Sequence, residues 1–286
     1  MDYEFLLSQP PLVVEHQYTA RDTILYALGT GAGLAASEDP RYLPFVYEEG
    51  LTVLPTMATV LAHPGFWAKD PKYGITWKKL LHRDQSVEIH GALPTEGTVR
   101  GETTIDAVYD RGAEKGALLC FSRRIFDSSS GQLLATTRQI NVLRADGGFG
   151  GPPDQTPPPH EPPDRDPDQL LRFVTGRDQN LVYRLSGDYN PLHVDPDVAQ
   201  AAGFPRPILH GLSSFGALGL AAVAAVCEFD ATRLKKLEAR FSSPVYPGDT
   251  LEIAVWRIGG DQAILQVRVM DRGVTVIRNG YVEWRL

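Results

Sequence analysis

Residues 183–215 read YRLSGDYNPLHVDPDVAQAAGFPRPILHGLSSF. The segment Ser186–Pro191 is a loop, because Gly, Asp, Asn and Pro are turn formers that do not continue a helix or a strand. Asp195–Pro196 then predicts an N-cap and the first turn of a helix over Asp197–Ala201. Further on, the apolar run Leu212–Val226 is rich in Gly and Ala, which is typical of a tightly packed buried helix. It is shorter than the ~20 residues that span a bilayer.

The loop carries three polar side chains that suit the handling of water. Asp188, Asn190 and His193 place a carboxylate, an amide and an imidazole within six positions. They could converge on one water molecule, with Asp accepting a proton, His exchanging one and Asn fixing the orientation. The alternative is that Asp188 and Asn190 only turn the chain and that His193 is a structural histidine.

A second element, Pro207–Leu212, stands directly before the apolar helix and reads PILHGL. Backbone N–H groups in the first turn of a helix lack internal partners and lie at the positive end of the helix dipole. Gly211 permits close approach, so its N–H could hold a developing oxyanion. Close helix packing is the alternative for Gly211, and His210 is better explained by packing or by support of its neighbours than by catalysis.

Outside this stretch, residues 147–167 read GGFGGPPDQTPPPHEPPDRDP. Proline removes backbone donors and disfavours helix at the preceding residue, so we predict an extended linker. It separates an N-terminal domain, residues 1–146, from a C-terminal domain, residues 168–286. A weak internal repeat at an offset of 157 residues, in which Tyr26–Gly29 resembles Tyr183–Ser186, indicates that the two domains arose by duplication.

Both halves contain an apolar segment followed by strands with alternating apolar and polar residues. In the first half we predict a short helix at 21–28, an apolar segment at 55–62 and strands at 86–90, 98–109, 117–127 and 133–144. In the second half we predict a polar helix at 166–177, a short β segment at 181–184, the apolar helix at 212–226 and strands at 239–241, 250–258, 263–271 and 274–285. This order predicts an α+β fold in which an antiparallel sheet wraps a central helix, present twice.

The bulk composition is that of a folded protein, with 43% hydrophobic and 22% charged residues. The formal net charge of −7 provides no overall basic field for nucleic acid or an anionic membrane, although a local basic pocket for a phosphorylated ligand is compatible with it. Cys120 and Cys227 cannot build a metal cage or a disulfide framework alone, and no metal is expected. The first residues lack a basic n-region and Trp284–Leu286 is a poor peroxisomal address, so we expect a cytoplasmic location.

The motif Arg184–Pro196, RLSGDYNPLHVDP, resembles the signature of the (R)-specific enoyl-CoA hydratases of the MaoC-like, or hydratase 2, family. All polar positions of that signature are present. Further similar segments, which extend the resemblance over nearly the whole chain, are Gly203–Phe204, Ile208–Leu212, Ala239–Asp249, Tyr26–Gly33, Leu80–His82 and Gly147–Gly151.

The resemblance implies a double hot-dog fold, usually arranged as a homodimer, with no cofactor because CoA is part of the substrate. Asp188 and His193 match the family's catalytic pair, Asn190 its water-orienting partner and Gly211 the contact to the thioester oxyanion. The positions that match contacts to the CoA portion are His82, Arg83, Arg111 and Phe241. Arg83 departs from the small residue that is usual there, so its contact is less well founded.

The implied reaction is the reversible hydration of trans-2-enoyl-CoA to (R)-3-hydroxyacyl-CoA, as in fatty acid metabolism. Under the repeat offset, Asp188 corresponds to Gly31 and His193 to Ala36, so the first half lacks acid–base groups. By resemblance, this catalytically silent half makes room for a long acyl chain.

Three other interpretations compete with the hydratase. A nucleotide-binding dehydrogenase is suggested by Gly29–Gly33, GTGAG, but Leu34 stands where the third glycine belongs and no strand precedes the motif. A thioesterase on the same fold would direct water to the thioester carbon instead of C3. A non-enzymatic module would bind acyl thioesters without turnover.

Overall fold

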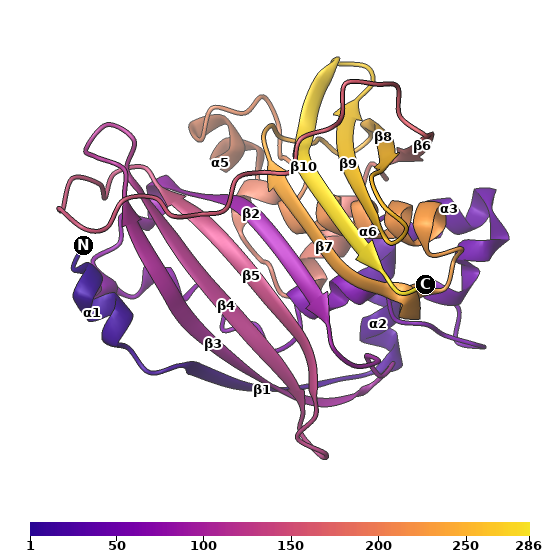
Figure 1. The fold of residues 1–286 in the computed structure, drawn as a ribbon, viewed down its shortest axis with the longest axis horizontal. Coiled ribbons are helices and arrows are strands. Elements are labelled where there is room, and N and C mark those ends of the chain that lie inside the picture. The colour runs from indigo at the N-terminus through magenta and orange to yellow at the C-terminus, as the bar shows by residue number, and fades with distance from the viewer.

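A single antiparallel sheet of ten strands runs through the molecule in the order β1-β3-β4-β5-β2-β7-β10-β9-β8-β6 (Figure 1). The computed structural model describes residues 1–286. The first half supplies β1 (Leu12–Tyr18), β2 (Leu80–Ile89), β3 (Gly97–Asp110), β4 (Ala117–Asp127) and β5 (Leu133–Leu143). The second half supplies β6 (Gln169–Val174), β7 (Leu234–Phe241), β8 (Thr250–Arg257), β9 (Gln262–Val269) and β10 (Val274–Trp284).

The two halves of the sheet join where β2 pairs with β7, with Gln85 opposite Ala239 and Asp84 opposite Arg240. The Asp84 carboxylate accepts hydrogen bonds from the Arg240 side chain at 2.7 and 3.0 Å. Because main-chain pairing and a half-buried ion pair both cross this boundary, the halves form one continuous sheet instead of two separate ones.

The central helix of the second half is α6 (Gly211–Val226), which lies against the sheet behind β7 and β10 in Figure 1. Nearly all of its side chains are buried, as expected for a helix that is apolar on every side. The remaining helices are short and are α1 (Tyr3–Ser8), α2 (Ala20–Gly29), α3 (Ala32–Glu38), α4 (Gln179–Tyr183) and α5 (Pro196–Ala201). None of the helices combines the length and the apolar character that crossing a membrane requires.

The first half has only a short 3-10 helix, η2 (Pro55–Thr59), where the second half has α6. Its chain leaves the turn at Ala62, whose φ of 48° ends any helical continuation, and Pro64 follows two residues later. The inner face of the N-terminal half of the sheet is therefore covered by one tight turn and irregular chain.

Two sequence predictions in the second half are wrong. Residues 166–177 contain the edge strand β6, paired with β8, instead of a polar helix. Residues 181–184 continue α4 and a following 3-10 turn instead of a strand. Tyr183 is buried against Tyr26, with ring centroids 6.0 Å apart, so tertiary packing overrides the β propensity of the local residues.

Residues 147–167 form neither helix nor strand, in agreement with the predicted linker. The linker crosses the sheet to reach β6 at the far edge (Figure 1). His160 stacks on Tyr281 of β10 with centroids 4.0 Å apart, and its carbonyl accepts a hydrogen bond from Asn279. Trp256 donates to the Arg165 carbonyl, so the linker is fixed at several points.

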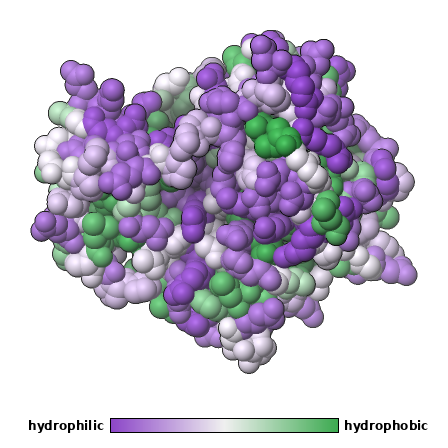
Figure 2. Space-filling view, viewed as in Figure 1, coloured by the Kyte–Doolittle hydropathy of each residue, from purple (hydrophilic) through white to green (hydrophobic).

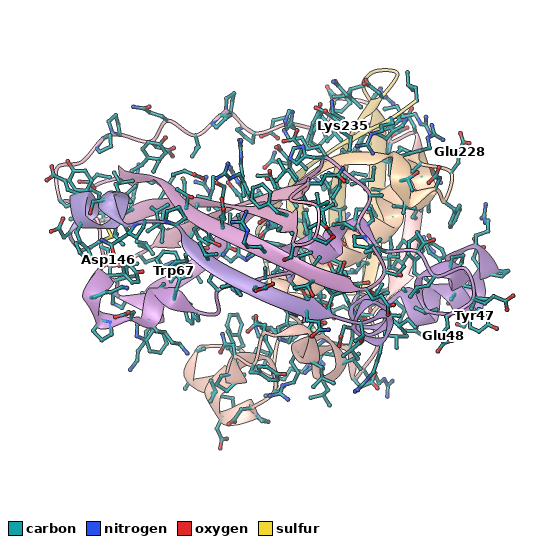
Figure 3. The ribbon with its side chains drawn as sticks, turned by 90° about the horizontal axis from the view of Figure 1, so that it is seen from below. Tyr47, Glu48, Trp67, Asp146, Glu228 and Lys235 are labelled. Carbon is teal, nitrogen blue, oxygen red and sulfur yellow. The ribbon has the colours of Figure 1, made fainter.

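The apolar interior consists of a large cluster around α6 and a smaller one at the far end of the first half. Trp67 lies at that end in Figure 3, near Asp146, and packs edge-on against Phe121 of β4. The face in Figure 2 is mostly hydrophilic, with apolar residues in small separate patches. The architecture is the predicted α+β double hot-dog, in which a full-length central helix is present in the second half alone.

Candidate active site

The loop between α4 and α5 is shaped by its own polar side chains. Gly187, at φ 113°, ends a 3-10 turn in a conformation that favours glycine. The Asp188 carboxylate then accepts a hydrogen bond from the N–H of Asn190, and the Asn190 amide oxygen accepts one from Leu192. Both residues thus turn the chain, as the alternative reading proposed, but the Asn190 NH₂ group and the second Asp188 oxygen stay free.

His193 is held in one orientation at the end of this loop. Its side chain is buried, and its Nδ1 lies 3.0 Å from the Ile208 carbonyl oxygen. A carbonyl can only accept, so Nδ1 carries the proton and Nε2 presents a lone pair. The His193 carbonyl in turn accepts a hydrogen bond from buried Asn180 of α4. The imidazole is therefore placed as a base through Nε2.

The structure brings Asp188 and His193 together and adds His210 to them. Side-chain atoms of the three residues lie within 4.8 Å of one another. His210 Nε2 donates to the backbone carbonyl of Asp188 at 3.1 Å, and its ring stacks on His193 with centroids 3.8 Å apart. His210 therefore supports the acid and the imidazole at the same time.

The electrostatics keep both imidazoles neutral near pH 7. Burial lowers the pKa of His193 below 6.5, although the neighbouring Asp188 acts in the opposite direction. Burial also lowers the pKa of His210, and the adjacent His193 lowers it further. His193 can therefore accept a proton from water at neutral pH.

Gly211 is the first residue of α6, with His210 as the N-cap. Its N–H donates no hydrogen bond within the protein. A Cβ at this position would touch the Phe241 ring at 3.6 Å, which is an ordinary contact. Space for packing therefore does not require a glycine here, whereas the unpaired N–H at a helix N-terminus is available to an anionic oxygen.

The four residues expected to touch CoA fall into two pairs. His82 meets the Phe241 ring edge-on at 5.0 Å, and Phe241 borders Gly211, so these two lie beside the N-terminus of α6. Arg83 forms an ion pair with Asp84 at 2.8 Å. Arg111 is half-buried and directly follows the end of β3.

Arg83 and Arg111 share a neighbour in the linker. Burial would raise the pKa of Asp154, but hydrogen bonds from Thr156 and the charges of both arginines lower it. Because Arg83 already pairs with Asp84, a CoA phosphate would have to compete with two carboxylates there. The arginines thus form a polar group around the linker, separate from His82 and Phe241.

Two residues close to the site were not predicted. Asn180 has no local sequence signal, because its bond to the His193 carbonyl spans a loop. His63 follows η2 and is exposed, yet desolvation lowers its pKa to about 3, with a further contribution from Arg123 and opposition from Asp188. This shift comes from segments far apart in the chain, which a His-Pro-Gly turn does not reveal from sequence.

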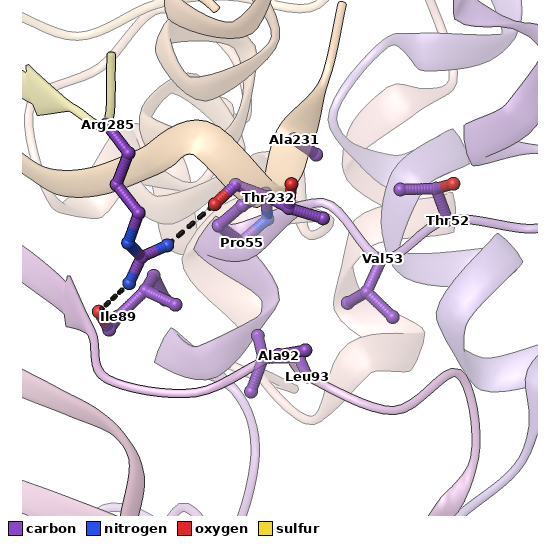
Figure 4. Close-up of a pocket in the computed structure, with 9 residues that line it drawn as sticks. All are labelled: Thr52, Val53, Pro55, Ile89, Ala92, Leu93, Ala231, Thr232 and Arg285. Atoms are coloured by element: carbon purple, nitrogen blue, oxygen red, sulfur yellow. Dashed lines mark hydrogen bonds between the residues drawn. The ribbon is translucent and has the colours of Figure 1, made fainter.

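The counterpart of His210 in the first half is apolar. Val53, which corresponds to His210 under the repeat offset, lines a cavity of about 110 Å³ shown in Figure 4. Arg285 reaches across it to the carbonyls of Ile89 and Thr232 at 3.0 and 2.6 Å. No acid or imidazole lines this cavity. A second cavity of about 410 Å³, bordered by Arg177 and Arg206, also excludes the catalytic loop.

Asp188, His193 and His210 are close enough to be considered as metal ligands. A metal lies in the plane of each imidazole that binds it, whereas these rings are stacked with planes only 27° from parallel. His193 Nδ1 and His210 Nε2 are also engaged by carbonyls. The arrangement suits a bound water better than an ion.

Both halves of the chain match known protein families. The MaoC like domain matches residues 155–280, and the MFE-2 hydratase 2 N-terminal domain matches residues 16–145. A 3-hydroxyacyl-thioester dehydratase of Mycobacterium tuberculosis is 41% identical, covering 94% of this chain and 93% of the relative. The peroxisomal enoyl-CoA hydratase 2 of Arabidopsis thaliana is 36% identical, covering 99% and 95%.

The crystal structure of a MaoC-like dehydratase from Phytophthora capsici superimposes with a TM-score of 0.88 at 32% identity, covering 100% of this chain and 99% of that one. Fold and loop therefore define a MaoC-like double hot-dog protein. More specifically, the chain belongs to the two-domain hydratase 2 family, whose named members are hydro-lyases. The dehydrogenase alternative fails, because Gly29–Gly33 joins two helices and follows no strand.

Proposed function

We propose that the protein catalyses the reversible hydration of trans-2-enoyl-CoA to (R)-3-hydroxyacyl-CoA. The observation that carries the proposal is the convergence of the Asp188 carboxylate and the buried His193 imidazole within 4.8 Å, beside a helix N-terminus with an unpaired N–H at Gly211. Relatives named enoyl-CoA hydratase 2 support the choice of reaction and of an acyl-CoA substrate.

In the proposed mechanism the thioester carbonyl polarises the 2,3 double bond, and the Gly211 N–H stabilises the enolate character that develops on the carbonyl oxygen. Asp188 and His193 Nε2 hold one water, with the Asn190 NH₂ group fixing its orientation. The hydroxyl adds to C3, and the proton removed from water is returned at C2, so the elements of water are fully accounted for. The acid and the imidazole act as a coupled pair in these transfers.

The remaining parts of the proposal concern the substrate. His82 and Phe241 border Gly211 and would contact the CoA portion near the thioester, while Arg83 and Arg111 would reach its more distant groups. The first half, which lacks an equivalent of α6, would accommodate the acyl chain. A homodimer and a cytoplasmic location remain predictions, and the Arabidopsis relative is named as peroxisomal.

The test is to follow the loss of enoyl-thioester absorbance with crotonyl-CoA and then to assign the product with (R)- and (S)-specific dehydrogenases. Formation of the (R)-3-hydroxy product supports the proposal. Release of free CoA thiol without a hydroxy product would instead indicate a thioesterase. Tight binding of crotonyl-CoA without any turnover would indicate a non-enzymatic acyl-thioester module.

A further inference from the structure

The inner face of the N-terminal half of the sheet is interrupted by a row of three buried polar residues. Arg123 of β4 is paired in register with Thr103 of β3 and Thr137 of β5, and all three are 3–5% exposed. On the same face of β4, Phe121 belongs to the smaller apolar cluster and Ile125 to the larger one. A row of polar side chains therefore separates the two apolar clusters.

Arg123 has no acidic partner. Its Nη2 donates to the carbonyls of Ala58 and Thr59 in η2, at 3.3 and 2.6 Å. Nε is buried without any acceptor, and the Oγ1 of Thr103 beside it is also buried and unpaired. Burial lowers the pKa of Arg123 to about 10, so the guanidinium still carries its charge at neutral pH. A buried charge without a counter-ion is costly and calls for a partner.

The residues around this guanidinium offer further donors. His16 Nδ1 accepts from the N–H of Ala62, and His63 Nδ1 accepts from the N–H of Gly65. Each neutral imidazole therefore carries its proton on Nε2. A Cβ on Gly101 would lie 2.7 Å from Cβ of Ala62 and 3.2 Å from Cδ of Arg123, so Ala62 lies beside the Arg123 side chain. His16 binds the N–H of Ala62 and His63 is the next residue, and the charge of Arg123 contributes to the lowered pKa of both histidines. The charge of Asp188 acts in the opposite direction on the pKa of His63.

We propose that Arg123, with Thr103 and His63, forms a binding site for a carboxylate at the far end of the substrate's acyl chain. The inference rests on the proposed function and specifies its substrate class: 2-enoyl-CoA esters of dicarboxylic acids, in addition to esters with a methyl end. The site consists mainly of donors and lies between the two apolar clusters. A guanidinium recognises a carboxylate through charge and hydrogen-bond geometry together.

A purely structural role for Arg123 makes a different prediction. As a cap on the carbonyl end of η2 it would affect folding stability and leave substrate preference unchanged. Its bonds to Ala58 and Thr59 satisfy that role with one nitrogen, Nη2, and they leave Nε buried without an acceptor. Substrate preference is therefore the quantity to measure.

The experiment compares kcat/KM for pairs of 2-enoyl-CoA substrates of equal chain length that end in a methyl group or in a carboxylate, over a series of lengths. The measured quantity is the ratio of kcat/KM for the carboxylate substrate to kcat/KM for the methyl substrate. At the length where the carboxylate reaches Arg123, we expect this ratio to be lower in Arg123→Met than in wild type by about 10-fold or more, since a charged hydrogen bond is lost. Arg123→Lys should retain part of the preference. Arg124→Met is the matched control, because Arg124 is the exposed neighbour on the opposite face of β4 and pairs with Glu102.

A second measurement separates this inference from the proposed reaction. Dissociation constants of saturated acyl-CoA esters with methyl or carboxylate ends, obtained by calorimetry, report on the site without turnover, while crotonyl-CoA hydration reports on the chemistry alone. A carboxylate preference that is lost in Arg123→Met supports the site even if no hydration is found. Equal methyl-to-carboxylate ratios in wild type and Arg123→Met at every length would overturn it.

Discussion

His193 and His210 stack face to face, with ring centroids 3.8 Å apart and ring planes 27° from parallel. His210 is the N-cap of α6 and also donates to the backbone carbonyl of Asp188. One buried side chain therefore links the helix that begins at Gly211 to both members of the proposed acid–base pair, Asp188 and His193. This arrangement makes His210 a positioning residue that does not itself need to touch substrate.

Separating the two contacts of His210 tests that role. His210→Phe keeps a ring against His193 and loses the donor to Asp188, whereas His210→Asn keeps a donor and loses the stacking. We expect kcat for crotonyl-CoA to fall by about 10²-fold or less in each, with a smaller change in KM, because small displacements of catalytic groups are costly. A shifted acid limb in the pH profile of kcat should accompany the fall in His210→Asn. A wild-type kcat and pH profile in both variants would leave His210 as a packing residue.

Asp188→Asn and His193→Ala should abolish most hydration while the protein stays folded. The acid lies at the protein surface and the imidazole at the end of a polar loop, so neither is part of the main apolar core. Loss of either general acid–base group is expected to lower kcat for crotonyl-CoA by ~10²–10⁴-fold. Far-UV circular dichroism checks the fold.

Asp197→Asn is the matched control for the acid, since Asp197 is an exposed carboxylate on α5, only nine positions away in the chain. It should keep wild-type turnover. Near-normal turnover by both Asp188→Asn and His193→Ala would remove these residues from the proposed mechanism.

The stability of the fold should decrease below pH 6.5, and His82 should account for part of the decrease. Burial lowers its pKa from 6.5 to about 4 in the folded protein, against the opposing effect of the Asp84 carbonyl and carboxylate. The unfolded chain then binds more protons than the folded chain between these values, so the free energy of unfolding is complete above pH 6.5 and is lost as the pH falls toward 4.

In His82→Gln the free energy of unfolding should fall less steeply as the pH decreases. Its slope should differ from that of wild type by less than about 1.4 kcal/mol per pH unit, because the His82 side chain is not wholly shielded from solvent. Urea unfolding at several pH values between 7 and 4.5 (roughly the window in which such groups titrate) measures the slope. His90→Gln serves as the control, because His90 is an exposed imidazole that directly follows β2, the strand that carries His82. Identical slopes in wild type and His82→Gln would contradict the assignment.

The sequence predicted the elements that depend on neighbouring residues. Turn formers predicted the turn at Asp188–Asn190, the apolar run predicted the helix at 212–226, and alternation predicted most of the strands. All of these are local properties. The helix at 166–177 was wrong because β6 is an edge strand whose conformation comes from pairing with β8. The sequence could not reveal that β2 and β7 pair into one sheet, because that register is decided by contacts between residues far apart in the chain.

The same limit applies to the site. Asp188 and His193 were predicted from their spacing, whereas the bond from Asn180 to the His193 carbonyl and the isolated charge of Arg123 emerge only when distant segments meet. Tyr26 and Tyr183, which correspond under the repeat offset, pack against each other at the junction of the halves. The sequence repeat did not indicate this contact, and the duplication stays a prediction.

Close contact between α6 and the first half depends on Gly216. A Cβ at this position would lie 2.1 Å from Cγ2 and 2.7 Å from Cβ of Thr30, so one of the two chains must move. Gly216→Ala should lower the free energy of unfolding by about 1–3 kcal/mol, the usual cost of overpacking. Thr30→Gly removes both of the crowded atoms, so the double variant Gly216→Ala/Thr30→Gly should recover part of the loss.

Urea denaturation of the four proteins in this cycle measures the coupling energy between the two positions, which we expect to be about 0.5–3 kcal/mol. Gly260→Ala, at a position with no atom within 4 Å of the added Cβ, is the control and should change stability little. Equal destabilisation by Gly216→Ala with and without Thr30→Gly would mean that the helix shifts to avoid Thr30, and that the two halves are less tightly packed there than the structure describes.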